Sequence, residues 1–239
     1  TPRRSKQRAP SMRSKLFVPG SRPELFDKAL ASPADALSFD LEDAVAEPKK
    51  ESARLILAEW MASPAACETK KCVIVRVNAI DTRFFEQDIA QVVRAGLDMI
   101  NIPKPDSAEA VCQAIKLIEQ AERQNGVNAD GQTPVKVLLN VETPKALRTA
   151  YELASAHARV AGLQLGLADL FEPIAVSRKE IFAVQYAMME MKMAAAEAGV
   201  AAFDAAYADI KNTDGSMGRM RVQWQDGAPR QIALMRIPR

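Results

Sequence analysis

Short apolar runs alternate along the chain with longer segments in which apolar residues recur at helical spacing. The short runs, of about five residues and rich in β-branched side chains, predict buried strands. They lie at residues 16–20, 36–43, 71–78, 99–104, 135–143 and 160–166. Helices are predicted from Pro23, over 48–62, 84–95 and 107–124, from Pro144, and over 178–198. Gly96 and Gly199 follow two of these helices, at positions where glycine commonly ends a helix.

Strands that alternate with helices indicate βαβ units and a parallel α/β sheet. The repeats recur at roughly 30 residues, which in a chain of 239 residues favours a TIM (β/α)8 barrel over a doubly wound sheet. The sequence contains neither GxGxxG nor GxxxxGKS, which weakens the nucleotide-binding alternative. A seventh strand can begin within 201–210, but no eighth unit is evident. We therefore expect a barrel that is incomplete or irregular at its C-terminal end.

The two ends of the chain differ from the segment between them. Residues 1–15 hold six basic residues and no acidic one, and we interpret residues 1–12 as a basic flexible arm before a barrel domain at 13–215. Residues 216–239 hold five arginines and one acidic residue, without a pattern of strand followed by helix. We interpret them as an atypical tail, either a disordered end or an unusual closing segment.

Composition narrows the classes of function. The 32 basic and 30 acidic side chains nearly balance, which argues against a dedicated nucleic-acid binder. No apolar run approaches the roughly 18 residues that span a bilayer. Three cysteines without a CxxC pair argue against a disulfide framework or a structural zinc site, and favour a reducing cytoplasm. Because His157 is the sole histidine, a Ser-His-Asp triad or a multi-histidine metal site is nearly excluded.

Charged residues follow the predicted strands at their carboxyl ends, where a barrel builds its active site. They are Asp40, Glu42, Asp43, Arg76, Glu142 and Asp169. A period of two places Asp40 and Glu42 on one face of their strand. Two carboxylates from neighbouring strands, such as Glu142 and Asp169, can hold Mg²⁺ together with waters. The planar fork of Arg76 suits a carboxylate substrate. The pattern therefore predicts a metal that polarises an oxo acid whose carboxylate is held by arginine.

Simpler structural interpretations stay open for each of these residues. Arg76 can pair with a neighbouring acid in a structural network, and Glu142 and Asp169 can support the starts of the helices that follow them. Lys104 is more typical of a rim residue, and His157, in a polar segment, of a surface residue.

Several longer segments resemble one known family, in the right order. RSKLFVPGSRPELFDKAL and ADALSFDLEDAVAEPKKESAR resemble the start of the citrate lyase β-subunit-like family, within the HpcH/HpaI aldolase group. VRVNAIDTRFFEQDI, AGLDMINIPK, VETPKAL and GLADL continue the likeness, and AFDAAYADIKNTDG resembles a later segment. The resemblance covers residues 12–215 and implies a TIM barrel, usually a homotrimer.

The resemblance also implies a Mg²⁺-dependent reaction that cleaves a 3-hydroxyacyl-CoA thioester into acetyl-CoA and a 2-oxo acid. By motif match, Glu142 and Asp169 would be the Mg²⁺ ligands, and Arg76 would hold the oxo-acid carboxylate. The acids expected around the waters of the metal are Asp40, Glu42 and Asp43, with Glu47 nearby. The residues expected near the pantetheine of the CoA are Arg13, Pro19 and Gly20. Arg76, Asp40 and Glu42 are the residues that we expect to be catalytic.

The chain departs from this resemblance after about residue 215. Relatives carry a Gly-rich turn, an Ile-His-Pro strand and a C-terminal lid that supplies an Asp to the neighbouring subunit, and none of these is evident from Ser216 onward. Such a shift is what a frameshift or a divergent truncation would produce. It places barrel closure, the proton donor and lyase turnover in question, while the metal and carboxylate positions stay intact.

We therefore expect a cytoplasmic carbon–carbon lyase, with citramalyl-CoA as the preferred substrate and citryl-CoA or malyl-CoA as alternatives. Its partners would be a CoA thioester and a 2-oxo acid, without nucleic acid or membrane. A second hypothesis is a catalytically weakened barrel that binds metal and an oxo acid or acts as an assembly partner. A pyruvate-dependent class II aldolase is less favoured, because those enzymes rely on a histidine base and His157 lies at no matching strand end.

Overall fold

The computed structural model describes residues 12, 14–127 and 133–206 of the chain. Its centre is a parallel sheet whose strands pair with one another in sequence order. The strands are β1 (Lys15–Pro19), β2 (Ala36–Asp40), β3 (Cys72–Arg76), β4 (Met99–Ile102), β5 (Lys136–Val141), β6 (Val160–Leu165) and β7 (Ala201–Phe203). The predicted apolar runs contain β2 to β6 and overlap β1, which begins one residue earlier than expected, and β7 begins the segment in which a seventh strand was expected.

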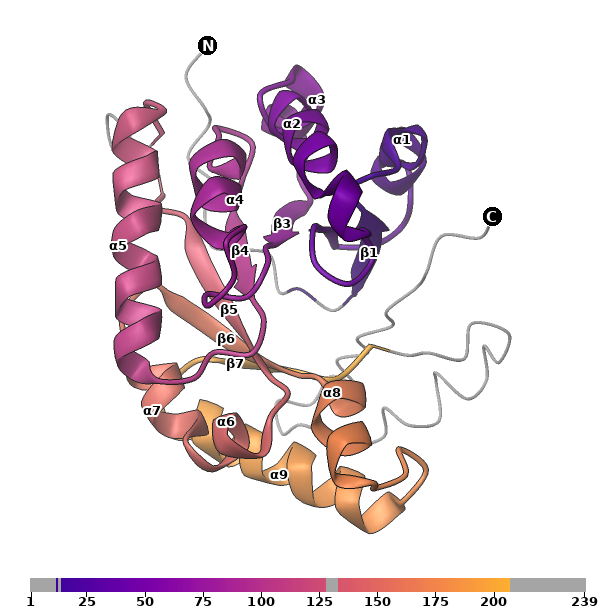
Figure 1. Ribbon diagram of the computed structural model, residues 1–239, viewed down its shortest axis with the longest axis vertical. Helices are drawn as coiled ribbons and strands as arrows, with labels where there is room; N and C mark the ends of the chain where they lie inside the picture. Colours follow the sequence, from indigo (N-terminus) through magenta and orange to yellow (C-terminus); the bar gives the residue numbers. More distant parts are fainter. Residues whose placement is uncertain (1–11, 13, 128–132, 207–239) are drawn as a thin grey trace.

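Helices connect successive strands and surround the sheet (Figure 1). They are α1 (Phe26–Leu30), α2 (Lys50–Met61), α3 (Pro64–Glu68), α4 (Phe85–Val92), α5 (Ala108–Gln124), α6 (Pro144–Arg148), α7 (Ala150–Ser155), α8 (Leu167–Phe171) and α9 (Ile181–Glu197). Short 3-10 turns lie at Pro23–Leu25, Glu47–Lys49 and Glu172–Ile174. The single helix expected from Pro144 is two helices, broken at Thr149. α3 and α8 were not predicted, because segments this short show no helical period.

The two glycines expected to end helices have different roles. Gly199 follows α9 with a φ of 71°, so its predicted role is confirmed. The prediction for Gly96 is wrong, because α4 ends at Val92 and Gly96 has no positive φ. A Cβ at Gly96 would lie 2.5 Å from the carbonyl oxygen of Met61, so glycine is needed there for close backbone packing.

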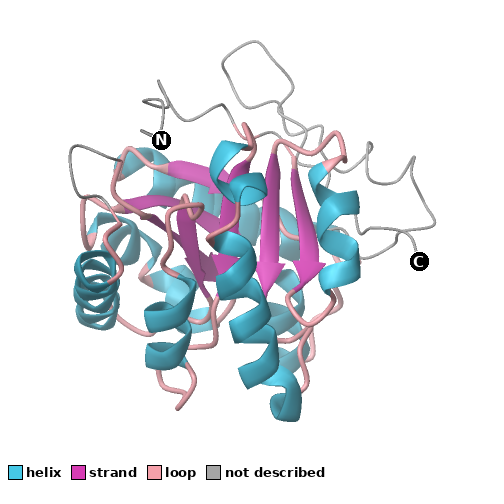
Figure 2. Ribbon diagram, turned by 90° about the horizontal axis from the view of Figure 1, so that it is seen from above, coloured by secondary structure: helices cyan, strands magenta, loops and turns pink. Residues whose placement is uncertain are grey.

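The sheet curls into a partial barrel, as contacts across its interior show. Lys15 on β1 donates a hydrogen bond to Gln164 on β6, although four strands lie between β1 and β6 in the order of the sheet. Figure 2 shows the strands turning around this interior, with helices outside them. Within the described part of the chain β1 and β7 do not pair, so the barrel is open between them. A TIM-type barrel that is incomplete at its C-terminal end is therefore confirmed.

The apolar core lies between the strands and the helices. Successive residues of a strand point to opposite faces, and the core takes alternate residues, such as Leu37 and Phe39 on β2. The residues between and after them, Ser38 and Asp40, are buried but polar, and they face the barrel interior together with Lys15. Burial of apolar surface thus stabilises the outer layer of the fold, and the inner layer is left for polar side chains.

A buried ion pair joins α2 to α4 next to the strand ends. Arg54 Nε donates to Asp88 Oδ1 at 2.7 Å, and the two side chains are 5% and 0% exposed. The other oxygen of Asp88 accepts hydrogen bonds from the backbone and side-chain nitrogens of Asn78, at 2.9 and 2.6 Å. The pair therefore fixes the segment that follows β3.

The predicted arm at 1–12, apart from Met12, and the predicted tail at 216–239 lie outside the described residues. Among the helices that are described, none has the length and apolar character needed to cross a membrane.

Substitution of Arg54 tests the buried pair. Arg54→Met should lower the free energy of unfolding by about 3–5 kcal/mol, because it leaves the Asp88 carboxylate buried without its cation. Urea denaturation followed by circular dichroism measures this change. Arg83→Met is the control, because the Arg83–Glu47 pair is 75% and 63% exposed and should contribute less than about 1 kcal/mol. Equal losses in the two variants would contradict the prediction.

Candidate metal and substrate site

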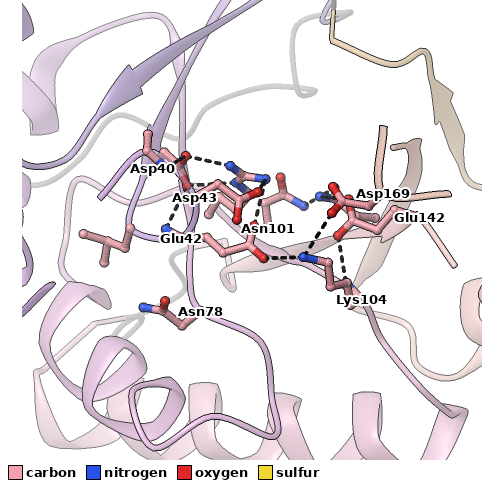
Figure 3. Close-up of polar contacts among 12 residues, drawn as sticks. Asp40, Glu42, Asp43, Asn78, Asn101, Lys104, Glu142 and Asp169 are labelled. Carbon is pink, nitrogen blue, oxygen red and sulfur yellow. Dashed lines mark hydrogen bonds and ion pairs between the residues drawn. The ribbon is translucent and has the colours of Figure 1, made fainter. Parts of the chain in front are cut away.

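The carboxyl ends of β2, β3, β5 and β6 bring the predicted charged residues to one rim of the barrel (Figure 3). Asp40 ends β2 and Arg76 ends β3, and the strand register pairs the two residues directly. Glu142 follows β5, and Asp169 lies in the first turn of α8, just after β6. Residues that are up to 129 positions apart in sequence, Asp40 to Asp169, therefore share one site.

The guanidinium of Arg76 binds two carboxylates. Its Nε and Nη2 donate to the two oxygens of Asp40 at 2.8 and 2.6 Å, and its Nη1 lies 2.8 Å from Glu42 Oε2. Burial raises the pKa of Asp40, but Arg76 more than offsets this effect and holds that pKa below its usual value. The structural pairing that the sequence left open is therefore present. Because arginine has five N–H donors, some remain for a ligand.

Lys104 contacts three carboxylates at the centre of the rim. Its backbone N–H donates to Glu142 Oε1 at 3.0 Å, and its Nζ lies 3.2 Å from Glu42 Oε1 and 3.4 Å from Asp169 Oδ1. Partial burial lowers the pKa of Lys104, but the charges of Glu42 and Asp169 raise it above the usual value. Lys104 does lie at the rim, as the sequence favoured, and there it links three of the site's carboxylates.

The backbone of Lys104 carries the signal that sequence reasoning missed. Lys104 stands between Pro103 and Pro105 directly after β4, and its φ is 45°. A left-handed φ is uncommon for a residue with a side chain, and such strained positions cluster at functional sites. A lysine held between two prolines at a strand end could have been selected as a candidate on that ground.

Glu142 is buried below the rim, and its ionisation is disfavoured. It is 2% exposed, and besides Lys104 its hydrogen-bond donor is Asn140, at 3.2 Å. Burial, followed by the negative charges of Glu42 and Asp169, raises the pKa of Glu142 from 4.5 to about 7. A carboxylate in this state would be stabilised by an additional positive charge close to it.

Neither Glu142 nor Asp169 caps a helix through its side chain. Thr143 caps α6 by accepting a hydrogen bond from the Ala146 N–H, and α8 begins after Gly166 without a side-chain cap. Neither acid is therefore a helix cap, although Asp169 lies in the first turn of α8, where a negative charge favours the helix. A Cβ at Gly166 would lie 2.4 Å from Oε2 and 2.5 Å from Cβ of Glu142, so this glycine makes room for the carboxylate.

The rim holds more negative than positive charge. Among the described residues, three of its four central carboxylates form ion pairs with two cationic side chains, and the fourth, Glu142, accepts a hydrogen bond from the backbone N–H of Lys104. The carboxylates belong to Asp40, Glu42, Glu142 and Asp169, and the cations to Arg76 and Lys104. A divalent cation would complete the balance of charge.

Glu142 and Asp169 fit Mg²⁺ by their donor chemistry. Mg²⁺ binds oxygen atoms and usually takes one or two carboxylates, with waters and substrate oxygens as its other ligands. In the described ranges no group of three or more His, Cys, Asp or Glu side chains is arranged to hold a metal ion. Two acids would therefore need oxygen atoms of water or substrate to complete the coordination.

Some predicted residues lie at the edge of this cluster or apart from it. The side chain of Asp43 is 60% exposed and reaches Arg76 at 3.5 Å. Glu47 does not join the cluster and pairs at the surface with Arg83. Arg13 lies outside the described residues.

Pro19 and Gly20 close β1 beside the site. The N–H of Gly20 donates to the carbonyl oxygen of Asp40 at 2.8 Å, and a Cβ at Gly20 would lie 2.9 Å from Leu41 Cδ2. The turn after β1 thus packs against the strand that carries Asp40. Its expected contact with a CoA thioester stays a prediction.

Comparison with known proteins identifies the family. The sequence matches the HpcH/HpaI aldolase/citrate lyase family over residues 13–232. The chain therefore belongs to this family of barrel proteins, and the resemblance drawn from its motifs is confirmed.

Two relatives and one solved structure show the range of this family. The citrate lyase subunit beta of Haemophilus influenzae is 36% identical over 93% of this chain and 78% of the relative. The L-malyl-CoA/beta-methylmalyl-CoA lyase of Cereibacter sphaeroides is 39% identical over 66% of this chain and 48% of the relative. The crystal structure of protein CitE from Mycobacterium tuberculosis with magnesium, acetoacetate and coenzyme A has a TM-score of 0.70 and 28% identity, covering 93% of this chain and 74% of that one.

The raised pKa of Glu142 predicts how stability depends on pH without metal. The pKa of Glu142 is about 7 in the folded state rather than 4.5, so the protonated carboxyl group favours the folded state. This contribution to the free energy of unfolding is present at low pH and is lost as the pH rises through about 7. In EDTA, Glu142→Gln should raise the free energy of unfolding at about pH 8, by up to about 3 kcal/mol, and leave it unchanged at about pH 4. Urea denaturation at both pH values measures this. The exposed Glu51→Gln is the control, and equal effects at both pH values would contradict the prediction.

Gly166 should be needed for metal binding. Gly166→Ala would displace the Glu142 carboxylate, and we expect about 10- to 100-fold weaker Mg²⁺ binding by calorimetry, as for other residues that orient metal ligands. Gly126→Ala is the matched control, because Gly126 has a φ of 64° and open space around its Cβ position. It should lose stability without losing Mg²⁺ affinity. Unchanged Mg²⁺ affinity in Gly166→Ala would show that Glu142 is not a ligand.

Proposed function

We propose that this chain is a Mg²⁺-dependent carbon–carbon lyase that cleaves a 3-hydroxyacyl-CoA thioester into acetyl-CoA and a 2-oxo acid. The observation that carries the proposal is the placement of Glu142 and Asp169 beside Arg76 at the barrel rim. Membership of a family that includes citrate lyase and malyl-CoA lyase proteins supports it. The magnesium and coenzyme A in the related CitE structure support the same ligand classes.

Different residues of the rim would bind the metal and the substrate. Glu142 and Asp169 would hold Mg²⁺, which when bound polarises oxygen atoms of the substrate. The free N–H donors of Arg76 would hold the carboxylate next to the hydroxyl-bearing carbon. Asp40 and Glu42 keep the guanidinium oriented, and Glu42 and Asp43 would contact waters near the metal.

The reaction is a retro-Claisen cleavage. The hydroxyl loses its proton, the bond to the adjacent methylene carbon breaks, and the former hydroxyl carbon becomes the carbonyl carbon of the 2-oxo acid. The bonding electron pair moves into the thioester as an enolate, and addition of a proton to its carbon gives acetyl-CoA. Positive charge that is already in place at the rim, on Arg76 and Lys104, would stabilise the negative charge that develops.

Three substrates satisfy this scheme. Citramalyl-CoA, which would release pyruvate, is the substrate expected from the sequence, and citryl-CoA and malyl-CoA are the alternatives. The thioester end would approach over Pro19 and Gly20, with Arg13 nearby. A homotrimer and a cytoplasmic location belong to the same proposal.

A direct assay tests the proposed function. The purified chain with Mg²⁺ should release acetyl-CoA from one of the three thioesters, and EDTA should abolish that release. Asp169→Ala should remove at least about 99% of the activity, because metal-site substitutions of this kind act on the reacting centre itself. Lys145→Met serves as the control, since the Lys145–Asp106 pair is exposed and should leave the rate unchanged.

The outcomes separate the two functional hypotheses. Cleavage of none of the thioesters, with Mg²⁺-dependent binding of pyruvate or oxaloacetate retained, would reject the lyase and support the weakened, ligand-binding barrel. Activity that persists in EDTA would contradict the role given to the metal.

A further inference from the structure

The barrel interior beneath the rim is polar. TIM barrels usually fill this space with branched apolar side chains, but here Lys15, Ser38, Asn101, Asn140 and Gln164 are buried polar residues of the strands. Asn101 Nδ2 donates to Asn140 Oδ1 at 2.8 Å, and Asn140 donates to Glu142. The interior polar layer is thus continuous with the candidate metal site.

Lys15 is a buried cation that lacks an acidic partner among the described residues. It is 2% exposed, its ammonium donates to the side-chain oxygen Oε1 of Gln164, and it lies 4.5 Å from the centre of the Phe17 ring. No carboxylate in the described part of the chain is within ion-pair distance of it. A buried charge without a counter-ion is costly. Burial and the repulsion of Arg76 lower the pKa of Lys15 from 10.5 to about 7.

Lys15 lies within electrostatic reach of the rim. Its ammonium interacts with the charges of Arg76, Asp40 and Glu142, the same residues that would hold the substrate. A ligand bound by Arg76 and the metal would therefore have this cation below it, inside the barrel.

Two further polar atoms of the interior have no hydrogen-bond partner among the described residues. They are Ser38 Oγ and Asn101 Oδ1. Ser38 lies on β2, two residues after Ala36, which pairs with Lys15, and therefore faces the same interior. Its hydroxyl can donate to an anion. Asn101 Oδ1 can accept a hydrogen bond from a substrate hydroxyl or a water. Buried polar atoms of this kind require an explanation, and an absent ligand is one.

We propose that Lys15, together with Ser38 on the neighbouring strand, binds a second carboxylate on the oxo-acid half of the substrate. The proposal rests on the proposed function, because it uses the same rim to hold the first carboxylate. It assigns the substrate to thioesters whose 2-oxo acid is a dicarboxylate, as in citryl-CoA. No rim residue distinguishes citramalyl-CoA from its alternatives, whereas Lys15 would favour citryl-CoA.

Binding of the two oxo acids tests the subsite without turnover. Freshly dissolved oxaloacetate and pyruvate are titrated separately by calorimetry into the chain with Mg²⁺. The wild-type chain should bind oxaloacetate about 10- to 100-fold more tightly than pyruvate, the range expected for a hydrogen bond to a charged group. Lys15→Met, which keeps the volume of the side chain, should abolish this preference and leave pyruvate binding unchanged.

Matched variants keep the test independent of folding. Lys145→Met should keep the wild-type preference, because Lys145 is exposed and paired with Asp106. Lys15→Met should unfold at the same temperature as the wild type or higher, since it removes a buried cation. If it does not fold, Lys15→Gln gives the same readout with a neutral polar side chain.

Each outcome decides between the two proposals. Oxaloacetate preference that survives in Lys15→Met, or that is absent from the wild type while both acids bind, would overturn the subsite and leave the lyase intact. Failure of both acids to bind in the presence of Mg²⁺ would overturn the proposed function, and the subsite with it.

Discussion

The contact between Arg76 and the acids of β2 is the interaction on which the rim depends. Asp40 is 3% exposed, and a carboxylate at that depth needs a cation or several N–H donors. Arg76 supplies the cation in bidentate geometry, and the N–H groups of Glu42 and Ala44 supply the donors. Because Arg76 is engaged by Asp40 and Glu42, its short contacts do not extend to Glu142 and Asp169, whose oxygen atoms would be available to a bound cation. The ion pair between Arg76 and Asp40 therefore favours Glu142 and Asp169, rather than Asp40, as metal ligands.

The two-residue period of the strands separates stability from chemistry. Alternate residues of each strand enter the apolar layer under the helices, where burial supplies the main stabilisation. The residues between them point into the barrel, where Asn101, Asn140 and Gln164 make hydrogen bonds across strands. A one-residue shift of register in any strand would exchange these two sets. The register that forms the core is thus the register that builds the site.

The sequence alone predicted the strands, because they follow from local periodicity. It also predicted the charged site residues, because the active site of a barrel lies at the carboxyl ends of its strands. It was not sufficient for Lys104, whose partners Glu42 and Asp169 are 62 and 65 positions away in sequence. Lys15 shows a different cause of failure. In the sequence it reads as the last basic residue of a charged segment, but as the first residue of β1 it points into the barrel. Only the strand register reveals that its charge is buried.

The fold tolerates a polar barrel interior because most of the apolar surface is buried elsewhere, between the sheet and the helices. The helices cover the outer face of the sheet, so substitutions inside the barrel alter the chemistry of the site with little effect on the packing that holds the strands together. Lys15 contacts Gln164 and Phe17 inside the barrel, so its replacement should leave the helix layer unchanged. The same barrel can therefore present different interior charges to different oxo acids, with the metal ligands and the arginine clamp kept in place. Selection among substrates by such an interior cation requires no change in the rim that performs the cleavage.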